Sequence, residues 1–120
     1  MANEITISTS LAFSKGGVGS SLSDTSLQFD VSGTDYFQGS QQVPITTSAA
    51  LNKGSITTCG YCYMKNTDST NFVTVEGTDG DTATIKLKAG EVALFRFNSS
   101  TPHVVADTAI CQIDYLLIED

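Results

Sequence analysis

ITISTSLAF, residues 5–13, has the clearest hydrophobic pattern at the start of the chain. Ile5, Ile7, Leu11 and Phe13 occupy odd positions, and Thr, Ser or Ala fills every position between them. Alternation with period two is typical of a half-buried β-strand, because successive side chains point to opposite faces of a sheet. The same pattern returns in residues 27–31, so the first quarter of the chain already predicts β-structure.

The remainder of the chain consists of short apolar segments separated by turns. The Gly/Ser-rich stretch from Lys15 to Asp24 is predicted to be a flexible loop. Pro44 has no amide hydrogen to donate, so it predicts an edge strand or an irregular strand end. Turn residues fill Asn66 to Asn71 and Gly77 to Asp81. Further extended segments, rich in β-branched and aromatic residues, are predicted at 36–45, 56–65, 72–76, 83–88, 92–97, 103–106 and 110–118.

This organisation predicts an all-β fold, an antiparallel β-sandwich that is jelly-roll-like and has about eight or nine strands. A parallel sheet would require crossover helices, and no stretch has a convincing helical period. An immunoglobulin-like sandwich is disfavoured because the chain contains no Trp. Residues 1–120 are expected to form a single domain. Within it, residues 1–24 are expected to be an N-terminal strand plus a flexible Gly/Ser loop that contacts a neighbouring subunit.

The charge and hydropathy of the chain argue against two classes of partner. Its 13 acidic and 6 basic side chains give a net charge of −7, and the basic residues are dispersed. Nucleic-acid binding depends on clustered basic side chains, so no nucleic-acid partner is expected. The apolar runs, such as residues 115–118, are too short to cross a bilayer, and residues 1–10 lack the features of a signal peptide. No membrane partner is therefore expected.

The chain contains three cysteines, an odd number that fits synthesis in a reducing compartment. Cys59 and Cys62 form a C-x-x-C, but they lie in a predicted strand, where residues three apart point to opposite faces. Redox activity of such a pair requires a helix N-terminus. The residue types would suit a zinc site of Cys59, Cys62, His103 and Cys111, which the same parity argument disfavours. Buried structural thiols are the favoured interpretation, and free, paired and metal-bound states stay open.

Three further motifs lack the partners that their chemistry requires. Residues 15–20, KGGVGS, resemble a phosphate-binding loop without the Lys before the final Ser and without a following helix. The acidic pair in Asp79 to Asp81 lacks the remaining ligand spacing of a calcium loop, so a solvated hairpin tip is predicted. His103 is unaccompanied by a nucleophile signature, which predicts a surface or edge-strand histidine. No catalytic, cofactor-binding or metal-binding residue is assigned, and the chain is predicted not to be an enzyme.

Several segments resemble small virion structural proteins of tailed bacteriophages. They cover about half of the chain, mostly its second half, and are YMKNTDSTNFV (63–73), IKLKAGEVALFR (85–96), ADTA (106–109), DYLLIED (114–120) and the opening MANEIT (1–6). The resemblance implies a capsid decoration or cement protein that binds the outer surface of a phage head and stabilises it. An alternative is a tail, fibre or neck module that binds a glycan or the host.

The same resemblance implies the partners and the location of the protein. The expected partners are the major capsid protein and copies of the chain itself, in a homo-oligomer such as a trimer. The expected location is the outer capsid surface of the virion, after synthesis in the host bacterial cytoplasm. The net charge of −7 agrees with an outer position, because packaged DNA would repel an acidic protein.

Overall fold

The structure, a computed structural model, describes residues 3–120, and these form two compact units. The first unit ends at Ser32, and the second is Gly33–Asp120. Strands make up 57% of the described residues, and these contain no helix, which confirms the all-β prediction. A single domain was expected over residues 1–120, whereas the contacts divide the chain after Ser32.

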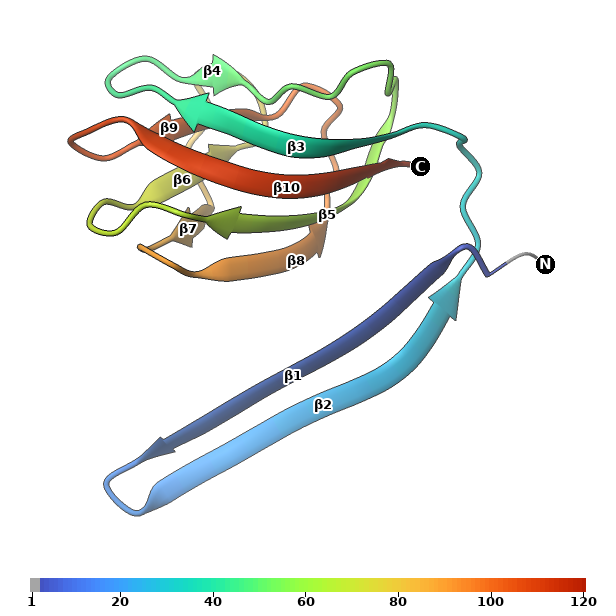
Figure 1. Cartoon of the computed structure of the whole chain (residues 1–120), viewed down its shortest axis with the longest axis vertical. Helices are drawn as coiled ribbons and strands as arrows, with labels where there is room; N and C mark the ends of the chain where they lie inside the picture. Colours follow the sequence, from blue (N-terminus) through green and yellow to red (C-terminus); the bar gives the residue numbers. More distant parts are fainter. Residues whose placement is uncertain (1–2) are drawn as a thin grey trace. The chain divides into compact units, whose positions relative to one another are not determined.

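The first unit is a long hairpin of β1 (Ile5–Lys15) and β2 (Val18–Phe29), which we call the arm (Figure 1). The flexible loop predicted over Lys15 to Asp24 is wrong, since only Gly16 and Gly17 connect the two strands. Both glycines have positive φ, 58° and 82°, which is the backbone conformation of the tight two-residue hairpin turn. With the chain reversed so early, the following Ser-rich residues pair with β1 and continue as strand.

The second unit contains two four-stranded sheets in which every strand pair is antiparallel. One sheet has the order β3 (Tyr36–Val43), β10 (Cys111–Glu119), β5 (Cys59–Asn66), β8 (Val92–Arg96). The other has the order β4 (Ala49–Ala50), β9 (His103–Ala106), β6 (Val73–Glu76), β7 (Ile85–Leu87) (Figure 1). This arrangement is consistent with the predicted β-sandwich. The described chain has ten strands, and jelly-roll topology stays a prediction.

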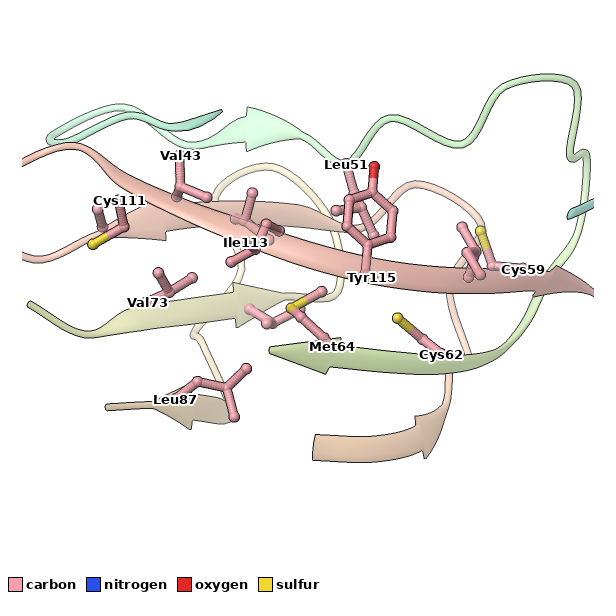
Figure 2. Packing of buried hydrophobic residues seen from close by; sticks show 14 of the residues in the cluster. Val43, Leu51, Cys59, Cys62, Met64, Val73, Leu87, Cys111, Ile113 and Tyr115 are labelled. Carbon is pink, nitrogen blue, oxygen red and sulfur yellow. The ribbon is translucent and has the colours of Figure 1, made fainter. Parts of the chain in front are cut away.

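The hydrophobic core lies between the two sheets. Alternate residues of β10 are buried, among them Ile113, Tyr115 and Leu117. Figure 2 shows Ile113 and Met64 from the first sheet beside Val73 and Leu87 from the second, and all four belong to one buried cluster. The edge strand β3 ends at Val43, directly before Pro44, as the missing amide of proline predicts.

A fully buried asparagine links the two sheets where β5 ends. Asn66 Nδ2 donates hydrogen bonds to the carbonyl oxygens of Asn71, at 2.9 Å, and Leu87, at 3.0 Å. Its Oδ1 accepts a hydrogen bond from the backbone N–H of Asp68 at 2.9 Å. A single side chain thereby satisfies three backbone groups of the turn after β5 and of β7.

A carboxylate near the end of the chain holds the segment that enters β3. Glu119 Oε1 accepts from the backbone N–H groups of Thr34 and Asp35, at 3.1 and 3.3 Å. Its Oε2 accepts from the N–H and hydroxyl of Thr57, at 3.0 and 2.8 Å. These hydrogen bonds, those from Thr57 first, lower the pKa of Glu119 to about 2. Between residues 3 and 120 there is no helix able to span a membrane.

Candidate functional site

One face of the arm is apolar along most of its length. In the antiparallel register Ile5 lies opposite Phe29, Ile7 opposite Leu27, and Leu11 opposite Leu22. Residues directly opposite each other project from the same face, and so do alternate residues of one strand. The apolar face is therefore formed by Ile5, Ile7, Leu11, Phe13, Val18, Leu22, Leu27 and Phe29, with Thr9, Lys15, Ser20 and Asp24 between them.

A β-bulge keeps this face continuous. Leu22 and Leu27 are five residues apart and would point to opposite faces of a regular strand. The register moves from Ile7 opposite Leu27 to Thr9 opposite Asp24, so β2 has one residue more than β1 at this point. Ser26, within the bulge, has a φ of 58°. The extra residue restores the parity of β2 and places both leucines on the same side.

The outer part of the apolar face is open to solvent. Leu11 and Leu22 are each 76% exposed, Val18 is 66% exposed and Phe13 is 57% exposed. Together these four side chains present about 500 Å² of apolar surface, a size at which an exposed patch is commonly an interaction site. An isolated two-stranded hairpin is at best marginally stable in water. The exposed apolar side chains of the arm are therefore a candidate interaction surface.

The two faces of the arm differ sharply in chemistry. The second face is formed by small, mostly polar side chains: Thr6, Ser8, Ser10, Ala12, Ser14, Gly19, Ser21, Ser23 and Gln28. The charged side chains on the apolar face are Lys15, beside the turn, and Asp24, at the bulge. Only one face of the arm is therefore suited to a dry contact, and it carries one charge of each sign.

The sequence predicts the β1 half of this face but not the β2 half. The alternation in residues 5–13 predicted a strand with one buried face, and residues 1–24 were expected to contact a neighbouring subunit. The part of β2 between Val18 and Leu22 was missed because its Ser and Gly content suggested a loop. The pair Gly16 and Gly17, midway between two apolar runs, was the available signal for a hairpin.

The structure places all three cysteines in the core, and all three are free thiols (Figure 2). The predicted opposite orientation of Cys59 and Cys62 is wrong, because a register shift between Leu117 and Glu119 brings both into the core. Burial raises the pKa of Cys62 to about 12 and also raises the pKa values of Cys59 and Cys111. Such thiols pack as small apolar groups and are poor nucleophiles.

The four residues considered for a zinc site are not brought together. Cys59 lies opposite Glu119, and Cys111 is at the other end of the same strand β10. At about 3.4 Å per residue, the length of β10 separates these two positions by about 27 Å. No group of three or more His, Cys, Asp or Glu side chains among residues 3–120 is placed to hold a metal ion.

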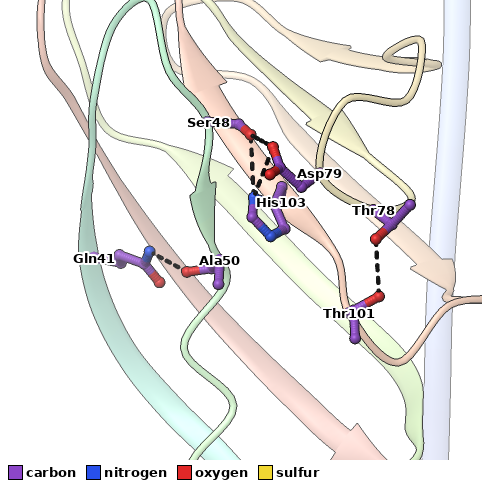
Figure 3. Close-up of polar contacts among 7 residues, drawn as sticks. All are labelled: Gln41, Ser48, Ala50, Thr78, Asp79, Thr101 and His103. Atoms are coloured by element: carbon purple, nitrogen blue, oxygen red, sulfur yellow. Dashed lines mark hydrogen bonds and ion pairs between the residues drawn. The ribbon is translucent and has the colours of Figure 1, made fainter.

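His103 makes polar contacts with Ser48 and Asp79 (Figure 3). Its Nδ1 lies 3.1 Å from Ser48 Oγ and 3.9 Å from Asp79 Oδ1, and Ser48 Oγ donates to the same carboxylate at 3.1 Å. A catalytic triad requires the serine and the carboxylate on opposite ring nitrogens. Here both approach Nδ1, so the cluster does not have the geometry of a triad. Its contacts instead connect the residue before β4 with the hairpin tip between β6 and β7.

His103 itself differs from its sequence prediction. An edge-strand or surface position was expected, but β9 lies between β4 and β6 and the side chain is only 18% exposed. Residues 77–81 form the exposed tip of the β6–β7 hairpin, as predicted. Residues 15–20 form the turn of the arm and the start of β2, without a helix to bind phosphate.

A shallow depression lies on the outer face of the β3-β10-β5-β8 sheet. Polar side chains surround a tyrosine there, and the lining includes Gln38, Ser40, Tyr63, Lys65, Asp114 and Leu116. Tyr63 is 48% exposed, and Ser40 Oγ donates to Asp114 Oδ1 at 2.6 Å. An exposed ring among hydrogen-bonding groups is able to stack on the apolar face of a sugar.

Comparisons of the chain with protein-family models, with curated protein sequences and with solved structures found no match.

Proposed function

We propose that this chain is a non-enzymatic structural protein of a phage virion, a capsid decoration or cement protein. In this role it binds the outer surface of the head and stabilises it. The observation that carries the proposal is the arm, a long hairpin with one exposed apolar face and one Ser/Thr-rich face. A protein that binds by area requires an extended surface of this kind, whereas an enzyme requires a cleft with convergent polar groups.

Two further features support an assembly role on the outside of a shell. Within residues 3–120, β1 and β2 form a two-stranded sheet, and an extended segment of a neighbouring subunit can add to the edge of such a sheet. The net charge of −7 keeps the protein away from packaged DNA and makes coated particles repel one another. The proposed partners are the major capsid protein and other copies of this chain.

The test is binding of the purified chain to phage heads prepared without it. The pair Leu11→Asp and Leu22→Asp charges the apolar face, while Ser10→Asp and Ser23→Asp charge a matched cross-strand pair on the polar face. We expect the wild type and the polar-face variant to co-sediment with heads, and the apolar-face variant to bind at least about tenfold more weakly. Equal binding of both variants, or no binding of the wild type, would refute the proposal.

A second candidate is a glycan-binding or host-binding module of a tail, fibre or neck. The specific observation in its favour is Tyr63 in its polar surroundings on the outer sheet face. Reproducible binding on a glycan array that is lost in Tyr63→Ala and retained in Tyr36→Ala would favour this function. Tyr36 is the matched control because it is an exposed tyrosine on the edge strand β3 of the same sheet.

A further inference from the structure

We propose that the outer part of the apolar face is covered by the arm of a second copy of this chain. The two arms pack face to face and antiparallel, related by a two-fold axis. This inference deepens the proposed function, on which it rests for the class of partner, by naming the surface and register through which two copies join. Self-association of the arms is nevertheless measurable without any capsid.

The apolar side chains of the face are more exposed to solvent near the turn than at the base of the arm, so the part near the turn is the expected contact surface. Ile5, next to the base of the arm, is buried, and Leu27 and Phe29 are each 39% exposed. Leu11, Phe13, Val18 and Leu22, toward the turn, are between 57% and 76% exposed. When two copies each contribute about 500 Å² of apolar surface, the contact exceeds about 1,000 Å² once its polar atoms are included. A contact of that size reaches the lower end of the range of specific interfaces.

The two charges on the face decide the direction of packing. Lys15 is in the last cross-strand pair before the turn, and Asp24 pairs with Thr9, six residues earlier along β1. This places the two charged positions about 20 Å apart along the arm. In a parallel arrangement each charge would meet its own copy at a partly dehydrated contact, which is unfavourable.

An antiparallel arrangement converts both repulsions into attractions. When the two-fold axis passes between the Leu11–Leu22 pair and the Phe13–Ser20 pair, Lys15 of each copy lies over Thr9 of the other, within reach of Asp24 in the same cross-strand pair. Two ion pairs then flank a centre made of leucine and phenylalanine side chains. The same axis leaves the base of the arm outside the contact, in agreement with its lower exposure. One two-fold arrangement therefore pairs the opposite charges, covers the exposed apolar side chains near the turn and leaves the less exposed base of the arm uncovered.

Engineered cysteines test this register directly. In a chain carrying Lys15→Cys and Asp24→Cys, each new thiol lies near the other kind of thiol in the second copy. Across the two packed sheets the new thiols are about 10 Å apart, which is too far for a disulfide but within reach of a short bis-maleimide, whereas within one arm they are about 20 Å apart and out of its reach. We expect a short bis-maleimide to cross-link the double variant into a covalent dimer and to leave the two single variants uncross-linked. The three native thiols are present in all three variants and serve as an internal control.

Each possible result of the cross-linking has a defined meaning. Cross-linking of a single variant to itself would indicate a parallel arrangement, such as a trimer about a three-fold axis, and would overturn the proposal. No cross-linking of the double variant would overturn it as well.

Charge reversal provides an independent test by sedimentation of the full chain. Lys15→Asp or Asp24→Lys alone creates two like-charge contacts per dimer and is expected to weaken dimerisation at least about tenfold. The double variant Lys15→Asp with Asp24→Lys restores both ion pairs and is expected to dimerise within about threefold of the wild type. Failure of this rescue, or a wild type that is monomeric at about 50 µM, refutes arm pairing. A monomer that still binds phage heads would refute this inference alone and leave the proposed function standing.

Discussion

Replacing Asn66 by Ala is expected to lower the free energy of unfolding of residues 33–120 by about 3 kcal/mol. The side chain is fully buried and makes three hydrogen bonds, all to backbone groups. Alanine leaves the carbonyls of Asn71 and Leu87 and the N–H of Asp68 without this partner. Each lost partner costs about 1 kcal/mol when the group stays buried. The total is about a third of the stability of a typical domain.

The isosteric change Asn66→Asp separates hydrogen bonding from packing. Its carboxylate still accepts from the Asp68 N–H but faces two carbonyl oxygens in place of the amide donor. At pH 7 we therefore expect a larger loss than in Asn66→Ala. Repulsion and burial raise the pKa of the introduced carboxyl above its unfolded value, so protonation stabilises the folded state and the loss becomes smaller as the pH falls from 7 to 5.

Guanidinium unfolding monitored by tyrosine fluorescence measures both effects. With a slope of about 3 kcal/mol/M, a loss of 3 kcal/mol moves the midpoint by about 1 M. Asn98→Ala, at an exposed asparagine, is the control and is expected to change stability by less than about 0.5 kcal/mol. A shift in Asn66→Ala that matches the control would show that the three hydrogen bonds do not stabilise the junction between the sheets.

Three further predictions follow from the same interior. Because hydrogen bonds hold the pKa of Glu119 at about 2, below its ordinary 4.5, its stabilisation is complete above pH 4.5 and is lost as the pH falls toward 2. The urea midpoint of the wild type should fall over that interval, and Glu119→Gln should remove this part of the fall. Since burial raises the pKa of Cys62 to about 12, a thiol reagent at pH 8 should modify it at least about a hundredfold more slowly in the native chain than in denaturant, and equal rates would contradict this burial. In Gly60→Ala the new Cβ would lie 2.9 Å from the carbonyl oxygen of Ile118, so its loss of stability should exceed that of Gly90→Ala, where the φ of +79° is strained but the space is open.

The parts of the fold that sequence predicted well are those in which local pattern and packing agree. The segment His103–Ala106 was predicted with the bounds that β9 has, and the last strand was predicted within one residue of β10. In both, one face packs into the core, so burial follows period two. The short strand β4 was missed because Ala49 and Ala50 have little strand propensity and are held only by pairing with β9.

The candidate site was predicted only in part, because a face of a hairpin is a property of two strands and their register. The alternation of residues 5–13 was visible in the sequence, but the partners of these residues were not. No local signal assigns Leu22 to the same face as Leu27, since their spacing is odd. Once the register is known, the face and its two charges follow directly.

Side chains depart from strict alternation at two places, in β5 and in β2, and in both a register shift is the cause. In the sandwich, a register shift opposite Leu117 brings Cys59 into the core beside Cys62, and the apolar side chains aligned in this way are buried. In the arm, the bulge at Ser26 aligns Leu22 with Leu27 in the same manner, but Leu22 stays 76% exposed. A bulge that interrupts strand pairing is expected to persist where the side chains it aligns are buried. The bulge in the arm is therefore explained if the apolar face is covered, as the proposed pairing of two arms provides.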